Sequence, residues 1–316
     1  MPYCWGLNYL LALIGVKTIQ GAVMRFVVAC SSLVLPLGLS AGESKQVQQP
    51  TEKTALDLLS YECDYGMKSD FKEKGGTLGG QDVLYNNFSY GHRFLISGQW
   101  YFRAGVKYER YDFGGNPLAP VPTKLQTAAG VLAVEYVEQG FAGAALELYP
   151  GEYFQDKIHG SGSFDIPWDI YSAFIIRDKK LYGMIGASGA LNNEVPIIPI
   201  AGVIWLTSDK TRAELIFPKT SLIYNPNDNW EWRMMWELTG GGYRLDENSN
   251  PDLNRAVVQY WDQRASVQAT YSGFKPFNVV LGVGYIFNRT FDYFRVHQSY
   301  TTEGTPFVRF SLGAQF

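Results

Sequence analysis

Apolar and polar residues alternate at every second position over much of the chain. In residues 305–316 one parity carries Val308, Phe310, Leu312, Ala314 and Phe316. The other parity carries Arg309, Ser311, Gly313 and Gln315. Successive side chains of a β-strand point to opposite faces, so this pattern predicts a strand with one apolar and one polar face.

The same alternation recurs in residues 59–68, 98–110 and 230–238. In the last of these, three tryptophans share one face, and charged residues occupy the other. A tryptophan-rich face is suited to hydrocarbon and to its interface with water. The tryptophans predicted to form an aromatic girdle facing lipid are Trp100, Trp205, Trp230, Trp232 and Trp236.

Clusters of Gly, Asn, Asp and Pro separate the predicted strands, and the connections alternate in length. The short ones fall at 96–98, 137–140, 177–180, 225–228 and 272–276. The long ones fall at 69–81, 113–123, 155–163, 244–254 and 288–303. Outer-membrane barrels have short periplasmic turns and longer external loops. The pattern therefore predicts an all-β fold, an antiparallel up-and-down transmembrane β-barrel formed by residues 55–316 as a single domain.

The number of strands is harder to derive because one segment is ambiguous. About 13 candidate strands are present, whereas single-chain bacterial barrels have even numbers. The ambiguity lies in residues 181–224, where Pro196, Pro199 and Pro218 cannot donate to a hydrogen-bond ladder and indicate a bulge or a departure from the sheet. The prediction is about 12 strands, with 10 or 14 left open. The last strand is predicted to close the barrel on the first, near residues 56–68.

Composition agrees with a barrel and argues against two other classes. The 316 residues are 18% charged and 15% aromatic, and the mean hydropathy is −0.12, which excludes a multi-helix membrane protein. A formal net charge of −3 argues against a nucleic-acid-binding protein, which would normally be basic.

The first 41 residues resemble an export signal with an over-extended start. Met24 is the expected true start, because Arg25 and an apolar stretch follow it and Ala41 offers a small residue for cleavage. Cleavage before Cys30, as in a lipoprotein, would cut the apolar stretch in its middle. Residues 42–54 form a polar leader. Of the three cysteines only Cys63 would remain, so it is expected to be an unpaired residue on an apolar face.

Three blocks resemble a porin-like family of Gram-negative outer-membrane β-barrels. They are GHRFLISGQWYFRAGVKYERYDFG (91–114), IPIAGVIWLTS (198–208) and FPKTSLIYNPNDNW (217–230). The resemblance covers most of the chain from about residue 56. It implies the fold and a bacterial outer-membrane location, and it provides no catalytic residue.

Charged residues on the faces opposite the apolar ones are expected to point into the lumen. An arginine facing lipid near the midplane would cost about 2–4 kcal/mol, so alternation places these residues inside. They would either pair with one another or form a ring that selects ions. The candidates for pore lining are Arg103, Lys107, Glu109, Glu231, Arg233, Glu237 and Arg309.

Enzymatic activity is not expected, because no histidine has a placed nucleophile. His92, His159 and His297 are scattered, and His92 has no serine in the position that a phospholipase of this kind would need. Asp165 and Asp169 share one parity and are interpreted as lumen-facing.

A calcium loop is suggested only weakly by alternating acidic and amide residues in one long connection. The candidate ligands are Asp246, Asn248, Asn250 and Asp252. Pro251 replaces the glycine that the sharp turn needs, and Val257 occupies the position of the bidentate glutamate. No metal and no cofactor are predicted.

The predicted function is a narrow passive channel for small hydrophilic solutes or ions. The alternatives are a non-conducting barrel that is structural or displays its loops and, third, a hydrolase. The expected partners are outer-membrane lipid and, during biogenesis, the barrel-assembly machinery; no nucleic acid is expected, and the sequence does not indicate an oligomeric state. Phe310, Leu312 and the terminal Phe316 resemble the C-terminal signal by which such machinery recognises barrels.

Overall fold

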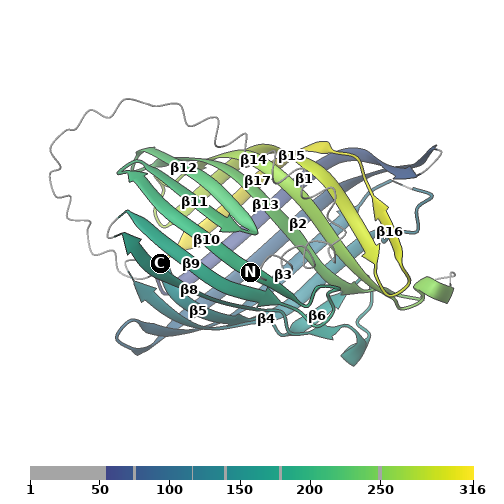
Figure 1. The fold of residues 1–316 in the computed structure, drawn as a ribbon, viewed down its shortest axis with the longest axis horizontal. Coiled ribbons are helices and arrows are strands. Elements are labelled where there is room, and N and C mark those ends of the chain that lie inside the picture. Colours follow the sequence, from purple (N-terminus) through teal and green to yellow (C-terminus); the bar gives the residue numbers. More distant parts are fainter. Residues whose placement is uncertain (1–54, 74–75, 116, 139–140, 178–179, 248–250) are drawn as a thin grey trace, which may run out of the picture. The chain divides into compact units, whose positions relative to one another are not determined.

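The described chain is almost entirely β-structure. A computed structural model describes residues 55–73, 76–115, 117–138, 141–177, 180–247 and 251–316 (Figure 1). The predicted signal and leader, residues 1–54, lie outside these ranges. Among the described residues the helices are the short 3-10 turns η1 (Gly160–Gly162) and η2 (Pro251–Leu253). No helix in those ranges is long and apolar enough to cross a membrane.

The strands follow one another around the wall in chain order. The first eight are β1 (Asp57–Glu73), β2 (Gly76–Ser97), β3 (Trp100–Phe113), β4 (Lys124–Glu138), β5 (Phe141–Leu148), β6 (Gly151–Phe154), β7 (Phe164–Asp165) and β8 (Trp168–Arg177). The next five are β9 (Leu181–Gly189), β10 (Ile197–Ser208), β11 (Thr211–Phe217), β12 (Lys219–Asn227) and β13 (Trp230–Arg244). The last four are β14 (Val257–Tyr271), β15 (Phe277–Tyr293), β16 (Gln298–Thr301) and β17 (Thr305–Gln315).

These elements make a closed antiparallel barrel of 14 wall strands, so the prediction of about 12 was wrong. Three wall strands each consist of two segments: β5 with β6, β7 with β8, and β16 with β17. Both segments of the first pair with β4, and both segments of the last pair with β15. The middle strand pairs with the first, β7 with β6 and β8 with β5. Pro150 separates β5 from β6, and Pro167 separates β7 from β8. Proline lacks an N–H and interrupts the ladder without ending the strand.

The ambiguous segment 181–224 contains four short strands. Pro218 lies at the tip of the β11–β12 hairpin, where Ile216 pairs with Lys219. Pro199 lies within β10 and pairs with β9 on one side only. Pro218 therefore marks a tight turn and Pro199 a free edge. The prediction took them for a bulge or a departure from the sheet and was two strands short for that reason.

The barrel closes between its first and last strands, as predicted. β1 pairs with β17 from Leu58↔Gln315 to Gly66↔Phe307. This seam leaves neither terminal strand with an open edge, which a barrel in lipid requires. The end of the barrel that carries the C-terminus and the short turns is called the turn end, and the opposite end the loop end.

Two predicted long loops are instead mostly strand. β1 and β2 form one hairpin across residues 69–81, with register shifts between Gly66 and Lys72, and β15 and β16 extend through most of 288–303. Their glycines and polar residues suggested exposed loops, but cross-strand pairing prevails. Connections 114–123, 155–163 and 245–256 are loops at the loop end, close to where they were predicted.

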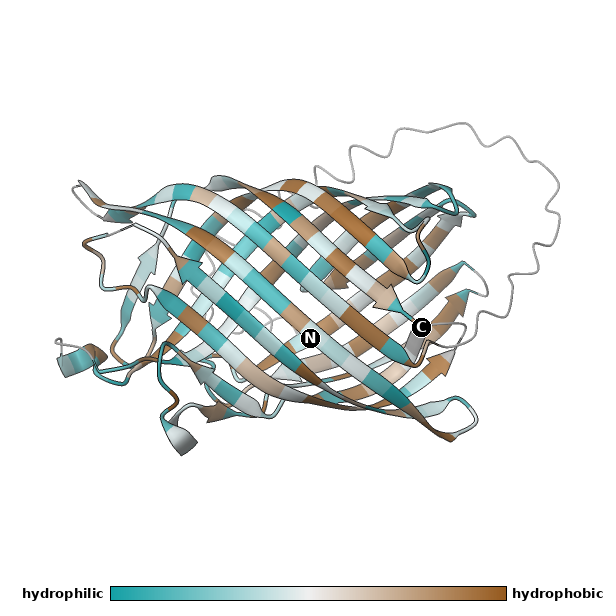
Figure 2. Ribbon diagram, turned by 180° about the vertical axis from the view of Figure 1, so that it is seen from behind, coloured by the Kyte–Doolittle hydropathy of each residue, from teal (hydrophilic) through white to brown (hydrophobic). Residues whose placement is uncertain are grey.

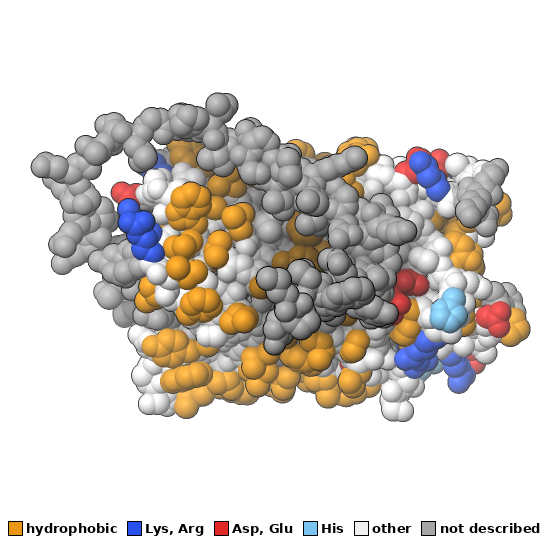
Figure 3. Space-filling view, in the orientation of Figure 1, with side chains coloured by type: hydrophobic (Ala, Val, Ile, Leu, Met, Phe, Trp, Pro, Cys, Tyr) orange, Lys and Arg blue, Asp and Glu red, His pale blue; other side chains and the backbone are white. Residues whose placement is uncertain are grey.

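The outer face of the wall is apolar and the charges gather toward the two ends (Figure 3). Seen from behind, hydrophobic and hydrophilic residues alternate along the tilted strands (Figure 2). Trp100, Trp205, Trp230 and Trp232 are exposed on the outer face and Trp236 partly so. Cys63 is unpaired and half-buried on the outward parity of β1.

The wall is not equally tall on all sides. At the loop end, β13 forms a parallel bridge with β6 between Arg244 and Phe154. This bridge joins two strands that are far apart around the 14-strand ring. A narrower ring of nine wall strands therefore closes above the shorter strands β8 to β12.

Candidate functional site in the barrel lumen

Inward-facing side chains change from charged to aromatic along the barrel axis. On β3 the inward parity carries Arg103, Lys107 and Glu109 and then, toward the loop end, Tyr111 and Phe113. Tyr111 is 2% exposed and Phe113 is 4% exposed. The lumen therefore has a polar section toward the turn end and a filled section toward the loop end.

One charge network lies on β2 to β5. Arg93 Nε donates to Glu135 Oε2 at 2.7 Å, and Arg103 Nε donates to Glu135 Oε1 at 2.6 Å. Arg103 also donates from Nη2 to Glu147 at 2.8 Å. Glu147 in addition accepts hydrogen bonds from Tyr149 and Tyr171. Every carboxylate of this network is thus satisfied by cations or hydroxyls.

A second network joins β13 and β14 to the seam and is almost fully buried. Arg309 donates to both oxygens of Asp64, at 2.8 and 2.7 Å, and to Glu237 at 2.9 Å. Arg264 donates to Asp64 and to Asp262. The fork of an arginine matches a carboxylate with two parallel hydrogen bonds, which are among the strongest in proteins. This network therefore holds the seam together from inside.

A third group of charges lies on β11 and on the turn-end half of β13. Arg233 pairs with Glu231 at 2.9 Å, and Arg212 pairs with Glu214 at 2.9 Å. The Arg212 side chain is 37% exposed, compared with 3% for Arg264. These pairs face a water-accessible lumen.

All seven residues proposed for pore lining lie on the inner face. Lys107 pairs with Glu109 at 3.1 Å, and Lys219 pairs with Glu237 at 3.5 Å. Each of the seven has at least one partner of opposite charge. The arrangement is that of paired charges, and their role in selecting ions stays a prediction.

Toward the loop end the lumen is filled by buried rings, which we call the aromatic plug. Its members are Phe71, Tyr111, Phe113, Tyr153, Tyr243, Tyr260 and Phe291. Phe113 and Tyr260 have ring centroids 5.3 Å apart, and Phe113 and Phe291 5.1 Å. In the nine-strand ring, β3 and β14 lie on opposite sides. The strands β4, β6 and β13 separate them in one direction, and β2, β1, the last wall strand (β16 with β17) and β15 separate them in the other. The Phe113–Tyr260 contact therefore crosses the lumen and blocks the straight path along its axis.

The plug was not predicted from the sequence, although a signal was present. The inward residues of β3 change from the charged Lys107 and Glu109 to the aromatic Tyr111 and Phe113. This change indicates that the lumen is filled with apolar side chains at that end, but it was not interpreted in this way. Nothing local in the sequence indicates the β6–β13 bridge that narrows the ring around these rings.

A set of loop contacts, which we call the loop clasp, continues the β6–β13 bridge at the loop end. Residues 155–163 meet residues 244–246 through a hydrogen bond from Gln155 N to Arg244 O at 3.0 Å and one from Arg244 Nε to Gly162 O at 2.7 Å. His159 Nε2 lies 2.8 Å from Asp246 Oδ1. The clasp joins segments about 90 residues apart in sequence and holds the loop-end residues of β6 and β13 side by side.

The other catalytic and metal candidates have structural partners. His92 Nδ1 lies 2.8 Å from Asp57, and His297 occupies a tight turn with a positive φ of 57°. Asp165 accepts backbone N–H groups from Leu191 and Asn192, at 3.1 and 2.9 Å. Asp169 lies opposite Glu147 in the β5–β8 ladder.

The calcium candidates do not converge within the described residues. Asp246 is engaged in the loop clasp, and Asn248 and Asn250 lie outside the described ranges. No group of three or more potential metal ligands occurs in the part of the chain that the structure describes. In the same loop, a hydrogen bond from Arg255 lowers the pKa of the exposed Glu247 carboxylate.

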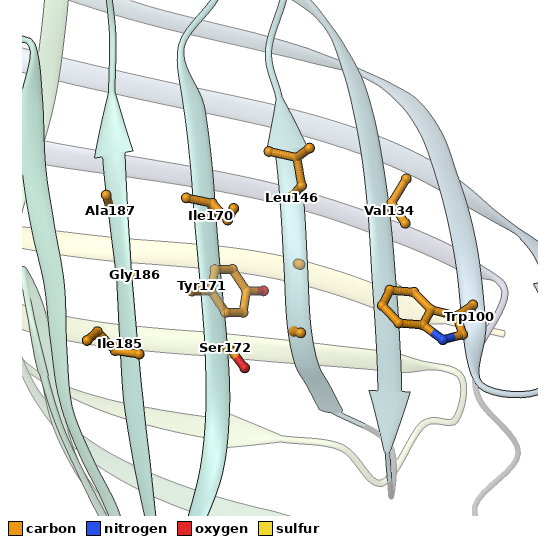
Figure 4. A pocket seen from close by; sticks show the side chains of 11 residues that line it. Trp100, Val134, Leu146, Ile170, Tyr171, Ser172, Ile185, Gly186 and Ala187 are labelled. Carbon is orange, nitrogen blue, oxygen red and sulfur yellow. The ribbon is translucent and has the colours of Figure 1, made fainter.

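A shallow apolar depression lies on the outer wall over β4, β5, β8 and β9 (Figure 4). Trp100, Val134, Leu146, Ile170 and Ile185 surround small residues such as Ala144 and Gly186. Its lining is mostly apolar, with the hydroxyl of Ser172 and the side chain of Tyr171 as its polar members.

Several solved structures of outer-membrane proteins are similar to this chain. An outer-membrane channel of Pseudomonas putida F1 has a TM-score of 0.48 and 9% identity, over 87% of this chain and 100% of that one. The NanC porin has a TM-score of 0.38 and 8% identity over 82% and 100%. The toluene transporter TodX of Pseudomonas putida has a TM-score of 0.34 and 10% identity over 83% and 90%. Each TM-score is below 0.5, so these likenesses carry no argument about function.

Neither a protein-family model nor a curated protein matches the sequence. The resemblance to one porin-like family therefore stays a prediction.

Proposed function

We propose that this chain is a β-barrel of the bacterial outer membrane that acts as a channel for small hydrophilic solutes or ions, with its axial path closed at the loop end. An apolar outer face and inward charges are the arrangement that a barrel in lipid requires. The long loops would face outward and the turn end the periplasm. Membrane lipid and the assembly machinery that inserts barrels are the partners that this proposal implies.

The observation that carries the proposal is a water-accessible lumen that ends at the aromatic plug. The inward-facing Lys219 side chain is 58% exposed, and Ser60 is exposed at the inner face of β1. In contrast, Tyr260 and Phe291 are 0% exposed only a few residues farther toward the loop end. Water and small solutes would enter from the turn end and stop at the plug, so conduction requires the plug or the loop clasp to move.

The paired charges make strong ion selectivity unexpected. A ring of unpaired like charges would select ions by sign, whereas Arg103 and Arg309 are each neutralised by two or more carboxylates. With 14 strands the lumen is also narrower than that of the 16–18-stranded porins.

The proposal is tested by single-channel recording of the purified barrel in a planar bilayer. We expect rare, small steps for the natural chain. The double variant Phe113→Ala, Tyr260→Ala removes two rings that meet across the lumen, so its steps should be several-fold larger and more frequent. Phe102→Ala on the outer face is the matched control and should behave as the natural chain. Silence of both the natural chain and the plug variant in correctly folded barrels would overturn the channel.

A non-conducting barrel is the second candidate, and the filled loop end is the observation that favours it. Buried rings and a hydrogen-bonded clasp would also give a rigid platform for displaying loops. This candidate predicts that the double plug variant loses stability but gains no conductance. The same recording therefore separates the two functions.

A further inference from the structure

The wall is interrupted between β10 and β13. The β11–β12 hairpin between them ends at residues 217–219, where Ala201 pairs with Phe217 and Lys219 pairs with Glu237 (Figure 1). Beyond this tip, β10 continues through Ile200 to Ile197 and β13 continues from Leu238 to Arg244. Among the described residues, no strand lies between these two stretches. We call this gap, bounded by residues 197–200, 217–219 and 238–242, the notch.

Both sides of the notch have the features of a free strand edge. Pro199 has no N–H to leave unpaired, which is why proline is tolerated at an edge. Gly240, Gly241 and Gly242 line the β13 side, and Gly240 has a φ of 136°, a conformation that side chains rarely allow. The glycines leave the β13 margin without side chains.

The notch is bordered above and below by contacts. At its lower end Leu238 N donates to Pro218 O at 3.2 Å. At its upper end the β9–β10 connection reaches across, because Glu194 N donates to Gln259 of β14 at 3.1 Å and Asn192 lies against Gly242. The opening between these contacts is about three strand spacings, roughly 14 Å, at the level of the hairpin tip before side chains narrow it.

The alternation of polar and apolar residues fails at the β10 margin. Residues that lie directly opposite each other in paired strands share a face of the sheet. Ile200 lies opposite Gly186, and Gly186 lies opposite Tyr171. Because Tyr171 donates a hydrogen bond to Glu147 in the lumen, Ile200 also faces inward. Ile198 has the same parity and Ile197 the opposite one, with an exposed fraction of 57%. Apolar side chains therefore line both the lumen side and the membrane side of this margin. Farther along β10 the inward Ile204 is also apolar, whereas the inward residues Arg212 and Glu214 of the neighbouring β11 are charged.

We propose that the notch is a lateral portal that binds small apolar molecules and connects the lumen beside the aromatic plug with the hydrocarbon of the outer leaflet. The outward residues of β10 are apolar as far as Ile197, which places the margin within the apolar band. Unpaired backbone at membrane depth is tolerated only where it is buried in protein or lines a water-filled cavity, and a portal from the lumen meets that condition. The inference rests on the proposed function in taking the barrel to be membrane-embedded with a solute-bearing lumen.

The dimensions and chemistry of the notch favour a single aromatic ring or a short alkyl chain. Ile198, Ile200 and Ile216 offer it apolar contact, and no charged side chain of the inner networks lies on the β10 stretch that borders the notch. The hydrogen-bonding groups at the notch are the backbone groups of its two free edges and Lys219 at the hairpin tip, whereas the side chains of the β10 margin are apolar. The portal and the closed axial path thus serve different solute classes.

The opening is tested by quenching of single fluorescent labels in lipid vesicles. In a Cys63→Ser background, an environment-sensitive fluorophore is attached to Ile200→Cys or to Ile204→Cys. Both positions are inward-facing isoleucines of β10, but Ile204 lies between β9 and β11 in an intact part of the wall. Lipid brominated on its acyl chains should quench the Ile200 label several-fold more than the Ile204 label, while aqueous iodide quenches both. Equal, weak lipid quenching at the two positions would overturn the portal.

Binding is tested with toluene as the probe. The emission of the Ile200 label should change saturably with toluene, whereas a label at the outward Ile197→Cys should report only the linear effect of toluene dissolved in lipid. A purely linear response at both positions would overturn the apolar site. These measurements do not depend on conductance. A barrel that shows no conductance but has a lipid-accessible Ile200 label would contradict the proposed axial channel and support the portal.

Discussion

The two sides of the barrel differ in how they use the same strand pattern. On the taller side, from β13 through the seam to β6, the strands are long, the alternation is kept, and the inner residues build buried networks and the aromatic plug. On the shorter side, from β8 to β12, the strands are short, inward residues of β10 are apolar, and the Arg212–Glu214 pair of β11 remains partly exposed. Where inner residues meet partners across a narrow ring they form a core. Where the ring is wide they face water.

The largest expected contrast concerns buried and exposed charge. Replacing Arg264 with alanine leaves Asp64 and Asp262 short of a buried partner, so the free energy of unfolding should fall by about 3–5 kcal/mol. Replacing Arg212 with alanine breaks a pair that is far more exposed, and the loss should be about 0.2–1 kcal/mol. Reversible urea unfolding in detergent measures both. Similar losses would mean that the two sides are equally buried.

The next contrast concerns local opening of the wall. Amides of residues 197, 198, 200 and 238–242 border the notch, whereas residues 259–266 lie between two paired strands. Backbone groups near a free edge open with less free energy than those in a continuous sheet. Hydrogen exchange followed by mass spectrometry should show amides at the notch exchanging about 100-fold faster than those of β14. Equal protection would place an additional partner over the notch.

A third test sharpens the role of the seam, which belongs to the taller side. The carbonyl of Phe316 accepts from Leu56 N and Asp57 N at 3.0 and 2.7 Å, and its ring is 60% exposed. Because so little of the ring is buried, deleting Phe316 should impair refolding in detergent only mildly. The amount inserted in cells should fall sharply if Phe316, with Phe310 and Leu312, forms the assembly signal. Heat-modifiable mobility of outer-membrane fractions measures insertion, and normal levels would leave Phe316 an interfacial aromatic only.

The smallest expected effect lies in the loop between β13 and β14. The hydrogen bond from Arg255 holds the pKa of Glu247 below its ordinary 4.5, so the pair is intact at neutral pH and is lost as the pH falls through that lowered value. Arg255→Gln should return the pKa of Glu247 toward the ordinary value, as followed by NMR of the carboxyl carbon. Stability should not change measurably, because both side chains are exposed. An unchanged pKa would show that the pair does not persist in solution.

Much of the fold could be predicted because alternation is a local property. The inward placement of Arg103, Glu237 and Arg309 and the outward placement of Trp205 and Trp232 follow from parity alone. The closing of β17 on β1 follows from the need of a barrel in lipid to have no free edge.

The remaining features depend on contacts that no local pattern encodes. The two extra strands were missed because Pro199 and Pro218 were read as interruptions, whereas one occupies a free edge and the other a hairpin tip. The plug requires the bridge between Arg244 and Phe154, which joins segments 90 residues apart. The notch in turn is visible only once the registers of β10 through β13 are known.

The buried pair of Arg309 and Asp64 has a consequence for how the barrel folds. The two residues are 245 positions apart, whereas most wall strands pair with their immediate neighbours in sequence. Hairpins between neighbours form early because their loops are short, and contacts of high sequence separation are slow to form. Asp64 therefore meets its partners Arg264 and Arg309 only when the ring closes, whereas Arg264 already has Asp262 on its own strand. Pairing β1 with β17 and burying the Asp64 carboxylate between two arginines are thus expected to occur in one late step of folding.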